Sequence, residues 1–238
     1  MKKVSALHSW VDNLPTDVRD AVLQRMRPRH YGDGEAVYTQ GEQGRELYRV
    51  ASGLIRFCHF TLSGKEFQSA VFRPGDCFGE LSMIDGLYRA NSAYAQGPAE
   101  LLILQEHDFK ALYAAHPEIA VQINRLLSHR LRMAYSFIED ASLLAIRDRL
   151  VRLLTRLGYS VGKADAQGAT VLKGFTHENL ARMLGTTREG ISRELKLLED
   201  LALIRRNYGR IVIPDIQALL EHCDVLGVGE IIVPYYEE

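Results

Sequence analysis

The sequence predicts an α+β fold: an N-terminal β-roll resembling a jelly roll, then one long helix, then a C-terminal winged helix-turn-helix domain. Three observations predict this fold. Short runs rich in Val, Ile, Phe and Tyr alternate with glycine-bearing turns from His30 to Glu106, which is typical of a closed or sandwiched sheet. An unbroken helical pattern covers Pro117–Leu143. Two short helical patterns then flank Gly185, and a hairpin pattern follows them.

The composition is that of an ordinary globular protein, with 47% hydrophobic and 25% charged residues among 238. No apolar run approaches the ~20 residues of a membrane span. The first residues lack the apolar core of a signal peptide, so we expect a cytoplasmic protein with no membrane partner. Three distant cysteines favour neither a disulfide framework nor a zinc site, and we expect Cys58 and Cys77 to be buried free thiols.

The charges are distributed unevenly, although the formal net charge is only −1. Residues 145–213 contain 13 Lys and Arg against 7 Asp and Glu, whereas the rest of the chain contains 16 against 23. A basic segment suits a phosphate backbone, and an acidic remainder would be repelled from it. The asymmetry therefore indicates at least two domains with different tasks.

The N-terminal half begins with short helical pieces from Val4 to Pro28, interrupted by Pro15. The segment Phe72–Leu81, FRPGDCFGEL, predicts a functional turn rather than a simple hairpin, because Pro-Gly-Asp is followed by Gly-Glu. The predicted strands of the β-roll are Ala36–Thr39, Leu47–Val50, Leu54–Phe60, Phe67–Phe72, Asn91–Ala95 and Glu100–Gln105.

A short helix from His107 to Ala115 precedes the long one, and two apolar stripes run along the long helix. A helix with two such stripes has two partners, which we expect to be its own β-roll and a second copy of the chain. The alternative is simple burial inside one large domain. The stripe expected to form the dimer seam is Leu127, Leu131, Ala134, Ile138 and Ala141, and the other is Ile123, Leu126, Arg130, Met133 and Phe137.

The C-terminal part predicts a helix over Ala145–Gly158 and a loop over Tyr159–Gly174, in which only Ala169–Leu172 resembles a strand. Leu203–Ile213 predicts a hairpin, the wing, and Asp215–Cys223 a last short helix. The wing arginines suit phosphates or a minor groove, and they are Arg205, Arg206 and Arg210.

Between these elements, Thr176–Leu201 predicts two capped helices joined at Gly185, with Thr176 and Thr187 as N-caps. Ile191, Leu195 and Leu198 would form the buried stripe of the second helix. Its opposite face has residue types that pair with base edges, namely Arg188, Glu189, Ser192 and Arg193. We expect contacts with the DNA backbone from Thr176, Thr187, Lys196, Arg205, Arg206 and Arg210. The alternative is a generic helical hairpin with a solvated charged face.

In this order of elements the chain resembles the CRP/FNR superfamily of bacterial transcription regulators, over nearly its whole length. TTREGISRELKLLED is similar to the family's recognition helix, so Arg188, Glu189 and Arg193 would touch bases. The resemblance implies a homodimer on a palindromic operator with TGA-containing half-sites, TTGAT-like or TGTGA-like, about 34 Å apart. It also implies that the loop Ser160–Gly168 contacts RNA polymerase, for activation, while repression by occlusion is equally compatible.

The same resemblance implies an effector site, because Arg89 stands nine residues after Glu80, as in the cassette that binds cyclic nucleotides. Glu80 would accept from a ribose hydroxyl and Arg89 would neutralise a cyclic phosphate. Ala90 follows where the family has a hydroxyl, so a structural ion pair between Glu80 and Arg89 is the alternative. The candidate effector residues are Gly79, Glu80, Leu81, Arg89 and Ala90.

The candidate effectors are a cyclic nucleotide, a cyclic dinucleotide or a small metabolite, and a chain without an effector is a further alternative. Haem would need an axial ligand, for which His129 is the only candidate by its place on the long helix. An iron–sulfur cluster needs about four clustered cysteines and is excluded.

The sequence thus predicts a β-roll over 1–116, a dimerisation helix over 117–144, a DNA-binding domain over 145–223 and an extension of unknown role over 224–238. The competing function is a ligand-binding and dimerisation module without DNA readout, against which the basic segment argues. No nucleophile, metal or phosphate-loop motif supports an enzyme.

Overall fold

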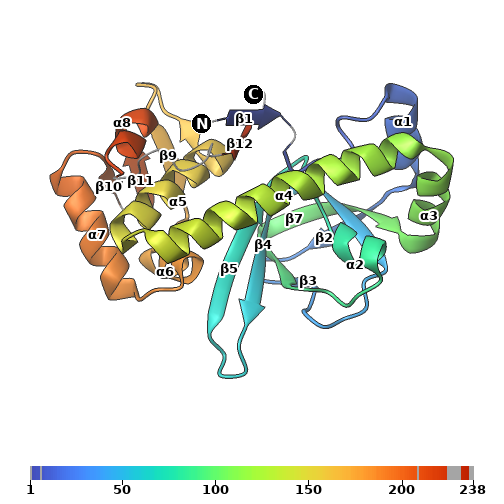
Figure 1. Cartoon of the computed structure of the whole chain (residues 1–238), viewed down its shortest axis with the longest axis horizontal. Coiled ribbons are helices and arrows are strands. Elements are labelled where there is room, and N and C mark those ends of the chain that lie inside the picture. The colour runs from blue at the N-terminus through green and yellow to red at the C-terminus, as the bar shows by residue number, and fades with distance from the viewer. Residues whose placement is uncertain (1, 6, 208, 224–231, 236–238) are drawn as a thin grey trace. The chain divides into compact units, whose positions relative to one another are not determined.

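The computed structural model of the protein describes residues 2–5, 7–207, 209–223 and 232–235. The chain divides into two compact units within its longest helix (Figure 1). One unit comprises Ala6–Leu131, and the other comprises Arg132–Glu238 together with Met1–Ser5. We refer to them as the roll unit and the C-terminal unit.

The roll unit is built on one antiparallel sheet, which confirms the predicted all-β character. Its main path runs in the order β2-β7-β4-β5, while β3 pairs with β7 and β6 pairs with β4. The strands are β2 (Arg27–Tyr31), β3 (Ala36–Tyr38), β4 (Glu46–Phe60), β5 (Glu66–Phe72), β6 (Cys77–Phe78) and β7 (Ser92–Gln105).

The predicted strand boundaries were wrong at two places, because two pairs of predicted strands are single long strands, β4 and β7. The register between them shifts around Ser52, where Gly53 has a φ of 79°. A Cβ on Gly53 would lie 2.4 Å from the carbonyl oxygen of Pro98, so only glycine lets the two backbones approach there. The sequence pattern also missed β2 and β6, which are too short or too polar to show a strand period.

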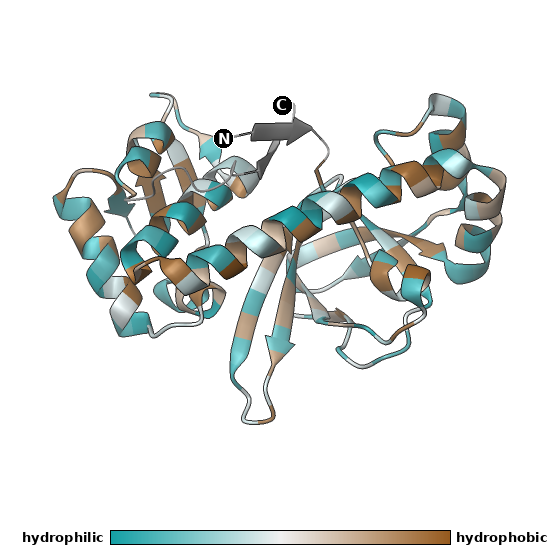
Figure 2. Ribbon diagram, viewed as in Figure 1, coloured by the Kyte–Doolittle hydropathy of each residue, from teal (hydrophilic) through white to brown (hydrophobic). Residues whose placement is uncertain are grey.

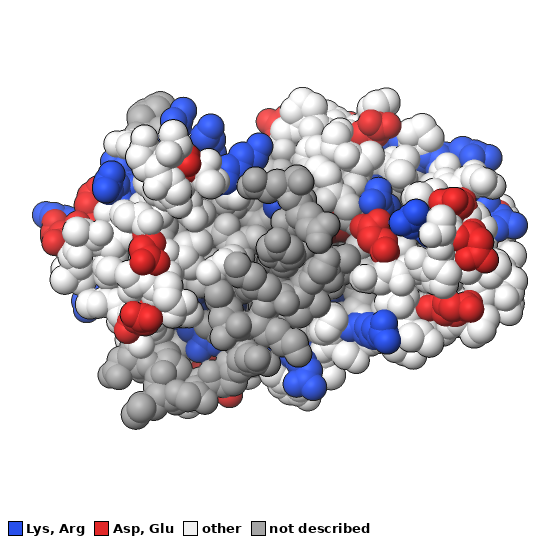
Figure 3. All heavy atoms as spheres, turned by 90° about the horizontal axis from the view of Figure 1, so that it is seen from above, with Lys and Arg blue, Asp and Glu red and all other residues white. Residues whose placement is uncertain are grey.

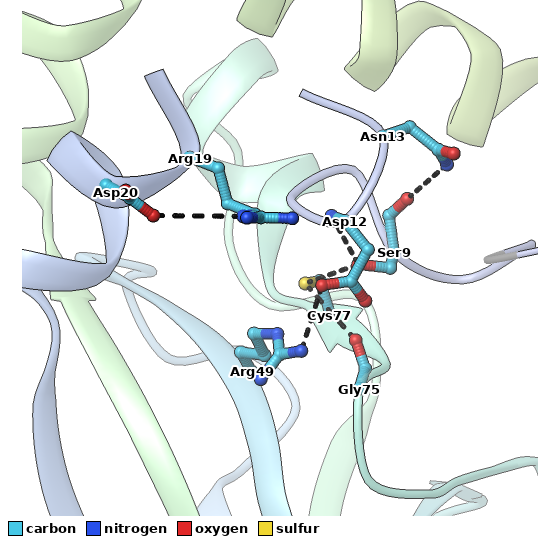
Figure 4. A network of polar contacts seen from close by, with 8 residues as sticks. All are labelled: Ser9, Asp12, Asn13, Arg19, Asp20, Arg49, Gly75 and Cys77. Carbon is cyan, nitrogen blue, oxygen red and sulfur yellow. Dashed lines mark hydrogen bonds and ion pairs between the residues drawn. The ribbon is translucent and has the colours of Figure 1, made fainter. Parts of the chain in front are cut away.

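In the described part of the N-terminal segment, the only helix is α1 (Thr16–Arg25), so the prediction of a helix around Trp10 was wrong. Trp10 is nevertheless buried in a core together with Val11 and Leu14, and polar contacts also hold this segment on the roll (Figure 4). The Arg49 guanidinium donates to the Asp12 carboxylate at 2.9 Å, and the Ser9 hydroxyl lies 3.8 Å from the Cys77 sulfur. The segment therefore packs by its apolar side chains without helical backbone geometry.

Three helices complete the roll unit. They are α2 (Glu80–Asp85), α3 (Glu106–Ala115) and the first part of α4 (Pro117–Leu143), whose bounds coincide with the predicted ones. Ile119, Ile123 and Leu126 of α4 are buried in a core shared with Trp10 and Phe109. A second core, inside the sheet, is rich in aromatic rings. Cys58 and Cys77 are buried free thiols, as predicted.

The C-terminal unit has a helical core against a small antiparallel sheet in the order β10-β11-β9-β8. Its elements are α5 (Ile146–Val161), β8 (Lys163–Ala164), β9 (Thr170–Lys173), α6 (His177–Leu184), α7 (Arg188–Asp200), β10 (Arg205–Asn207), β11 (Arg210–Ile213) and α8 (Ile216–Glu221). The predicted winged helix-turn-helix is confirmed. The predicted loop from Tyr159 was wrong in part, because α5 continues to Val161 and β8 pairs with β9.

Apolar and polar positions alternate along the helices of this unit (Figure 2). The apolar sides meet in one core to which Leu154, Leu180, Ile191, Leu195 and Ile213 contribute. Burial of these side chains is the main stabilising term, at about 1.5–3 kcal/mol for each large aliphatic group.

The last part of α4 is fixed to α5 by a buried charged cluster within the C-terminal unit. The Asp140 carboxylate lies 3.0 Å from Nε of Arg152 and 2.7 Å from a terminal nitrogen of Arg156. Both guanidinium groups also donate to the Ser136 hydroxyl. Because these charges are buried and paired, the angle between α4 and α5 is set by polar geometry as well as by packing.

The predicted extension over 224–238 forms strand β12 (Ile232–Tyr235), and 224–231 lies outside the described residues. β12 pairs in parallel with β1 (Lys2–Ser5), so the two ends of the chain meet in the same unit (Figure 1). Among the described residues, no helix has the length and apolarity needed to cross a membrane.

Candidate DNA interface and effector cassette

The helix-turn-helix is defined by its local capping. The Thr176 hydroxyl accepts from the backbone N–H of Asn179 at 3.1 Å, and the Asn179 side chain accepts from the backbone N–H of Thr176 at 3.0 Å. Gly185 ends α6 with a φ of 62°, a conformation that glycine adopts without strain. The Thr187 hydroxyl caps α7 by accepting from the backbone N–H of Gly190. All three capping predictions are confirmed.

The predicted base-reading side chains lie together on the solvent side of α7. Arg188, Glu189 and Arg193 are exposed and Ser192 is half-buried. Lys196, one turn further on, is also exposed. The opposite side of the helix is fully buried at Ile191, Leu195 and Leu198. The helix therefore has one anchored face and one free face, as a helix that enters a DNA groove requires.

Two arginines on α5 hold the helix-turn-helix from behind. Nε of Arg147 donates to the largely buried Glu194 carboxylate of α7 at 3.1 Å. The Arg149 guanidinium donates to the carbonyl oxygen of Leu184 at 2.6 Å, which satisfies a free acceptor at the end of α6. These contacts fix both helices to the same support.

His177, at the start of α6, lies near two cations of other elements. Burial lowers the pKa of His177, and the charges of Arg206 on β10 and Arg188 on α7 lower it further. Arg206 is itself paired with Glu199, so Arg188 is the one of these two cations that is exposed and available to an anionic partner.

The wing places its three predicted arginines differently. Arg205 and Arg210 are exposed, whereas Arg206 is half-buried. The Arg206 guanidinium donates twice to one oxygen of Glu199, from Nε at 2.7 Å and from a terminal nitrogen at 2.5 Å. Its backbone N–H donates to the other carboxylate oxygen at 2.8 Å. The structure thus groups Arg206 with α7 and leaves Arg205 and Arg210 toward solvent.

In the roll unit, the candidate effector cassette follows β6. Gly79 has a φ of 92° and starts α2, and a Cβ there would lie 2.9 Å from the carbonyl oxygen of Glu46. Arg89 is only 5% exposed, and its guanidinium donates to the carbonyl oxygens of Gly79 at 2.9 Å and Glu46 at 2.7 Å. The same group lies 4.3 Å from the centre of the Tyr38 ring. Arg89 is therefore satisfied by the protein itself.

Glu80 forms its ion pair with Arg130 of α4, so the alternative prediction of a structural ion pair between Glu80 and Arg89 was wrong. Glu80 is 1% exposed, and a second Arg130 nitrogen donates to the carbonyl oxygen of Cys77 at 2.6 Å. The second Glu80 oxygen, Oε2, is buried without a hydrogen-bond partner among the described residues. Arg130 was missed as the partner of Glu80, although it is the only charged member of its otherwise apolar stripe.

The remaining cassette residues are not directed inward. Leu81 and Ala90 are exposed, so only Gly79, Glu80 and Arg89 of the five candidates come together. Among the described residues, no group of three or more His, Cys, Asp or Glu side chains is arranged to hold a metal ion.

The predicted dimer seam is exposed in the single chain over most of its length. Leu131 is 55% and Ile138 61% exposed, and Ala134 and Ala141 are exposed as well. Only Leu127 packs partly against the core of the roll unit. Exposed apolar residues at coiled-coil spacing are what a second helix would cover.

Two family models match the chain. Residues 28–116 match the cyclic nucleotide-binding domain, and residues 148–222 match the Crp-like helix-turn-helix domain.

The chain is also similar to known regulators. It is 35% identical over 202 residues to the "Cyclic AMP receptor protein" of Thermus thermophilus, which covers 85% of this chain and 90% of that protein. It is 26% identical over 199 residues to a "CRP-like cAMP-activated global transcriptional regulator" of Mycobacterium tuberculosis, covering 84% and 89%.

Solved structures share the fold. The c-di-GMP responsive regulator CLP of Xanthomonas campestris matches with a TM-score of 0.73 and 24% identity, covering 84% of this chain and 100% of CLP. FixK2 of Bradyrhizobium japonicum matches with a TM-score of 0.75 and 19% identity, covering 85% and 99%.

Proposed function

The chain belongs to the CRP/FNR family of transcription regulators, and from that premise we propose that it binds a palindromic operator as a homodimer. Each protomer would insert α7 into the major groove of a TGA-containing half-site. The observation that supports this most strongly is the combination on α7 of a fully buried face and an exposed face with Arg188, Glu189 and Arg193. Relatives of this kind are regulators and not enzymes.

The chemistry of the exposed face matches base edges. An arginine donates two parallel hydrogen bonds to O6 and N7 of guanine, and a carboxylate accepts from the cytosine amino group. Arg188 and Glu189 lie in the first turn of α7 and Arg193 in the second, so they meet successive bases near the end of a helix that enters the groove. Ser192 and Lys196 flank them, the one toward base edges and the other toward phosphates.

Contacts with the DNA backbone would come from exposed cations and from the start of each helix. Lys196, Arg205 and Arg210 are exposed, and phosphate neutralisation by such groups supplies most of the non-specific affinity. Thr176 and Thr187 sit at the helix N-termini, where free backbone N–H groups favour phosphate oxygens.

Anisotropy with fluorescent duplexes tests this readout. We expect the parent protein to bind an inverted repeat of TGTGA or TTGAT at least about 1,000-fold more tightly than a scrambled duplex of equal length at the same salt concentration. A protein that binds the two duplexes equally does not read bases, and the proposal would then be wrong.

The dimer would form along the exposed stripe of α4, with each helix covering the other's Leu131 and Ile138. A charge in the centre of such a seam is strongly unfavourable because it is buried without a partner. We therefore expect Ile138→Glu to be monomeric by light scattering and to lose operator binding. The neighbouring exposed Glu139→Gln is the matched control and should stay dimeric.

The cassette would be the place where a small effector acts. Relatives are named for cyclic AMP or c-di-GMP. A phosphate could bind here only by taking over the guanidinium of Arg89 from the carbonyl oxygens of Gly79 and Glu46. The unpartnered oxygen of Glu80 is an acceptor for a ligand hydroxyl.

Calorimetry with cyclic AMP, cyclic GMP and c-di-GMP tests the effector proposal. Saturable binding that is lost in Arg89→Lys, with an unchanged melting temperature, supports it. An absence of heat with all three ligands, and operator binding that none of them changes, removes cyclic nucleotides as effectors.

The Ser160–Gly168 segment would contact RNA polymerase. It lies at the end of α5 and in the β8–β9 hairpin, apart in sequence from α6 and α7. Alanine substitutions at its exposed residues should lower transcription in a purified system while operator affinity stays constant. Unchanged transcription would indicate that this segment is not the contact.

A further inference from the structure

The wing is joined to the recognition helix by a short turn that ends α7 tightly. The backbone N–H of Leu203 donates to the carbonyl oxygen of Leu198 at 3.0 Å, and that of Ala202 donates to Glu199 at 2.9 Å. This is the Schellman arrangement, in which the residue after the cap is left-handed. Here that residue is Ala202, with a φ of 58°. The backbone turn thus ends α7 and starts the chain toward the wing.

A side-chain clamp spans the same turn. Glu199 lies in the last turn of α7, and both of its carboxylate oxygens are occupied by Arg206 of β10. The arginine uses three donors, namely its backbone N–H, Nε and a terminal nitrogen. A charge-assisted contact with several donors fixes direction as well as distance. We call this contact the wing clamp.

Side chains alternate between the two faces of the sheet along β10, which explains why Arg206, and not Arg205, contacts Glu199. In an antiparallel pair, residues directly opposite each other share a face of the sheet. Arg206 is opposite Ile211, which is buried in the core, so both lie on the inner face. Arg205 is opposite Val212, and Arg210 is opposite Asn207, so Arg205 and Arg210 share the outer face.

The charges give the clamp a functional consequence. Glu199 lies at the C-terminal end of a helix, where a negative charge is unfavourable. It also follows the exposed Lys196 by three residues, on a helix proposed to bind a polyanion. Hydrogen bonds from Arg206 lower the pKa of Glu199, so the carboxylate is ionised and its charge is neutralised within the protein. Without Arg206, it would repel phosphates.

We propose that Arg206 is a positioning residue that aligns the wing with α7 through Glu199, and that Arg205 and Arg210 are the wing residues that contact phosphates. This inference rests on the proposed DNA readout. It divides the wing arginines that were predicted to contact the DNA backbone into phosphate contacts and one positioning residue. A positioning residue and a phosphate contact differ in their dependence on salt. Each phosphate contact contributes about 0.9 to the slope of log K against log salt concentration.

The first experiment measures operator affinity between 50 and 200 mM salt for Arg206→Ala and for the adjacent control Arg205→Ala. We expect Arg205→Ala to lower the magnitude of the slope by about 1.8, because the dimer loses one phosphate contact in each half-site. Arg206→Ala should bind about 3- to 10-fold more weakly at every salt concentration with the parent slope, because a misplaced wing loses position and not a phosphate contact. A slope lowered as in Arg205→Ala would overturn the proposal, as would an unchanged affinity.

The second experiment is a double-mutant cycle with Glu199→Ala. If Arg206 acts only through Glu199, Arg206→Ala should change affinity less than about twofold once Glu199 is absent. A full loss in that background would show that Arg206 touches DNA directly. Neither substitution removes a base-reading residue.

A measurement without DNA separates this inference from the function on which it rests. Backbone amides of 205–207 and 209–212 should exchange with deuterium faster in Arg206→Ala than in the parent, and at the parent rate in Arg205→Ala. If exchange is faster in Arg206→Ala but neither the parent nor this variant binds an operator, the wing clamp is supported and the proposed function is wrong. If exchange is equal in all three, the clamp does not hold the wing.

Discussion

The roll unit and the C-terminal unit both present arginine and glutamate at their candidate sites, yet they use these residues in opposite ways. In the roll unit, Glu80 and Arg89 are buried and bonded within the protein, to Arg130 and to backbone carbonyls. In the C-terminal unit, Arg188 and Arg193 of α7 are exposed, and Arg193 has only a 3.8 Å contact with Glu194. The first set is bonded within the protein except for one buried oxygen of Glu80, which has no hydrogen-bond partner among the described residues, whereas the second set is exposed to an external partner.

The contrast shows that a motif in sequence does not establish that its residues are free to act. A charged side chain left in water costs little to keep, so its presence on an otherwise well-packed helix is compatible with an external partner. A buried ion pair instead contributes to the geometry of the fold. In Figure 3, Lys and Arg occur together with Asp and Glu among the described residues of the face shown.

The largest loss of stability is expected from breaking the buried ion pair between Glu80 and Arg130. Glu80→Ala leaves the Arg130 guanidinium in a largely buried place without its partner, and we expect the free energy of unfolding to fall by about 3 kcal/mol. Denaturant unfolding measures it. The matched control is Lys110→Ala, which breaks the exposed pair with Glu106 and should leave the free energy of unfolding almost unchanged. An equal loss in the free energy of unfolding from both substitutions would show that the buried pair is no more important for stability than the exposed pair.

On α7, we expect a substitution to weaken DNA binding without lowering stability. Arg193→Ala should leave the melting temperature unchanged, because the side chain is 72% exposed. It should weaken operator binding by about 1–3 kcal/mol for each half-site and relax the preference for one guanine in each half-site. Anisotropy with operators altered one base pair at a time measures both effects. Lys196→Ala is the control, which should weaken binding to all duplexes alike and lower the magnitude of the salt slope by about 1.8, because the dimer loses one contact in each half-site.

The buried groups of the roll unit also predict a dependence on pH. Burial, with the nearby charges of Arg130 and His129, lowers the pKa of His8 to about 3. The His8 ring packs edge-on against the Phe72 ring, with 5.6 Å between the ring centroids. The unfolded chain takes up a proton below about pH 6.5 that the folded chain does not. Stability is therefore complete above pH 6.5 and is lost as the pH falls toward 3, by about 1.4 kcal/mol per pH unit.

Unfolding of the parent and of His8→Phe between pH 7.5 and 5 tests this dependence. The variant should show a shallower loss of stability, because it has no imidazole to protonate. His107→Phe, at an exposed position, is the control and should follow the parent. Parallel curves for all three proteins would mean that His8 is not held neutral by the fold.

The smallest effect concerns the turn between α7 and the wing. Ala202 adopts a left-handed conformation that costs about 1 kcal/mol for a residue with a side chain. Glycine removes this strain but gains freedom in the unfolded chain, so Ala202→Gly should raise the free energy of unfolding by about 0.5 kcal/mol. Ala218→Gly, inside helix α8, should lower it by about 1 kcal/mol. A loss from Ala202→Gly would indicate that the turn is not strained.

Much of the fold could be predicted because its signals are local. The N-caps at Thr176 and Thr187, the left-handed Gly185 and the whole of α4 follow from residue types at fixed spacing. Strands β4 and β7 could not be bounded, since a glycine in a bulge has the same local pattern as a glycine in a turn. The helix predicted around Trp10 failed because apolar spacing gives burial but not backbone geometry.

The sites were less predictable because they depend on contacts between distant residues. Glu80 and Arg130 are 50 residues apart, and no local pattern pairs them. The wing was more predictable, since successive side chains of a strand point to opposite faces, which places Arg205 and Arg206 on different faces of the sheet. The sequence pattern therefore contained that distinction, but the partner Glu199 became evident only from the structure.

The central claim is that the exposed face of α7 recognises bases. The most direct measurement is selection from a random DNA library, performed in parallel with the parent protein and with Arg193→Ala. We predict that the parent enriches an inverted repeat of TGA-containing half-sites about one helical turn apart. The variant should enrich a repeat with relaxed preference at one guanine in each half-site. An absence of any enriched sequence with the parent, or an identical repeat from both proteins, would contradict the claim.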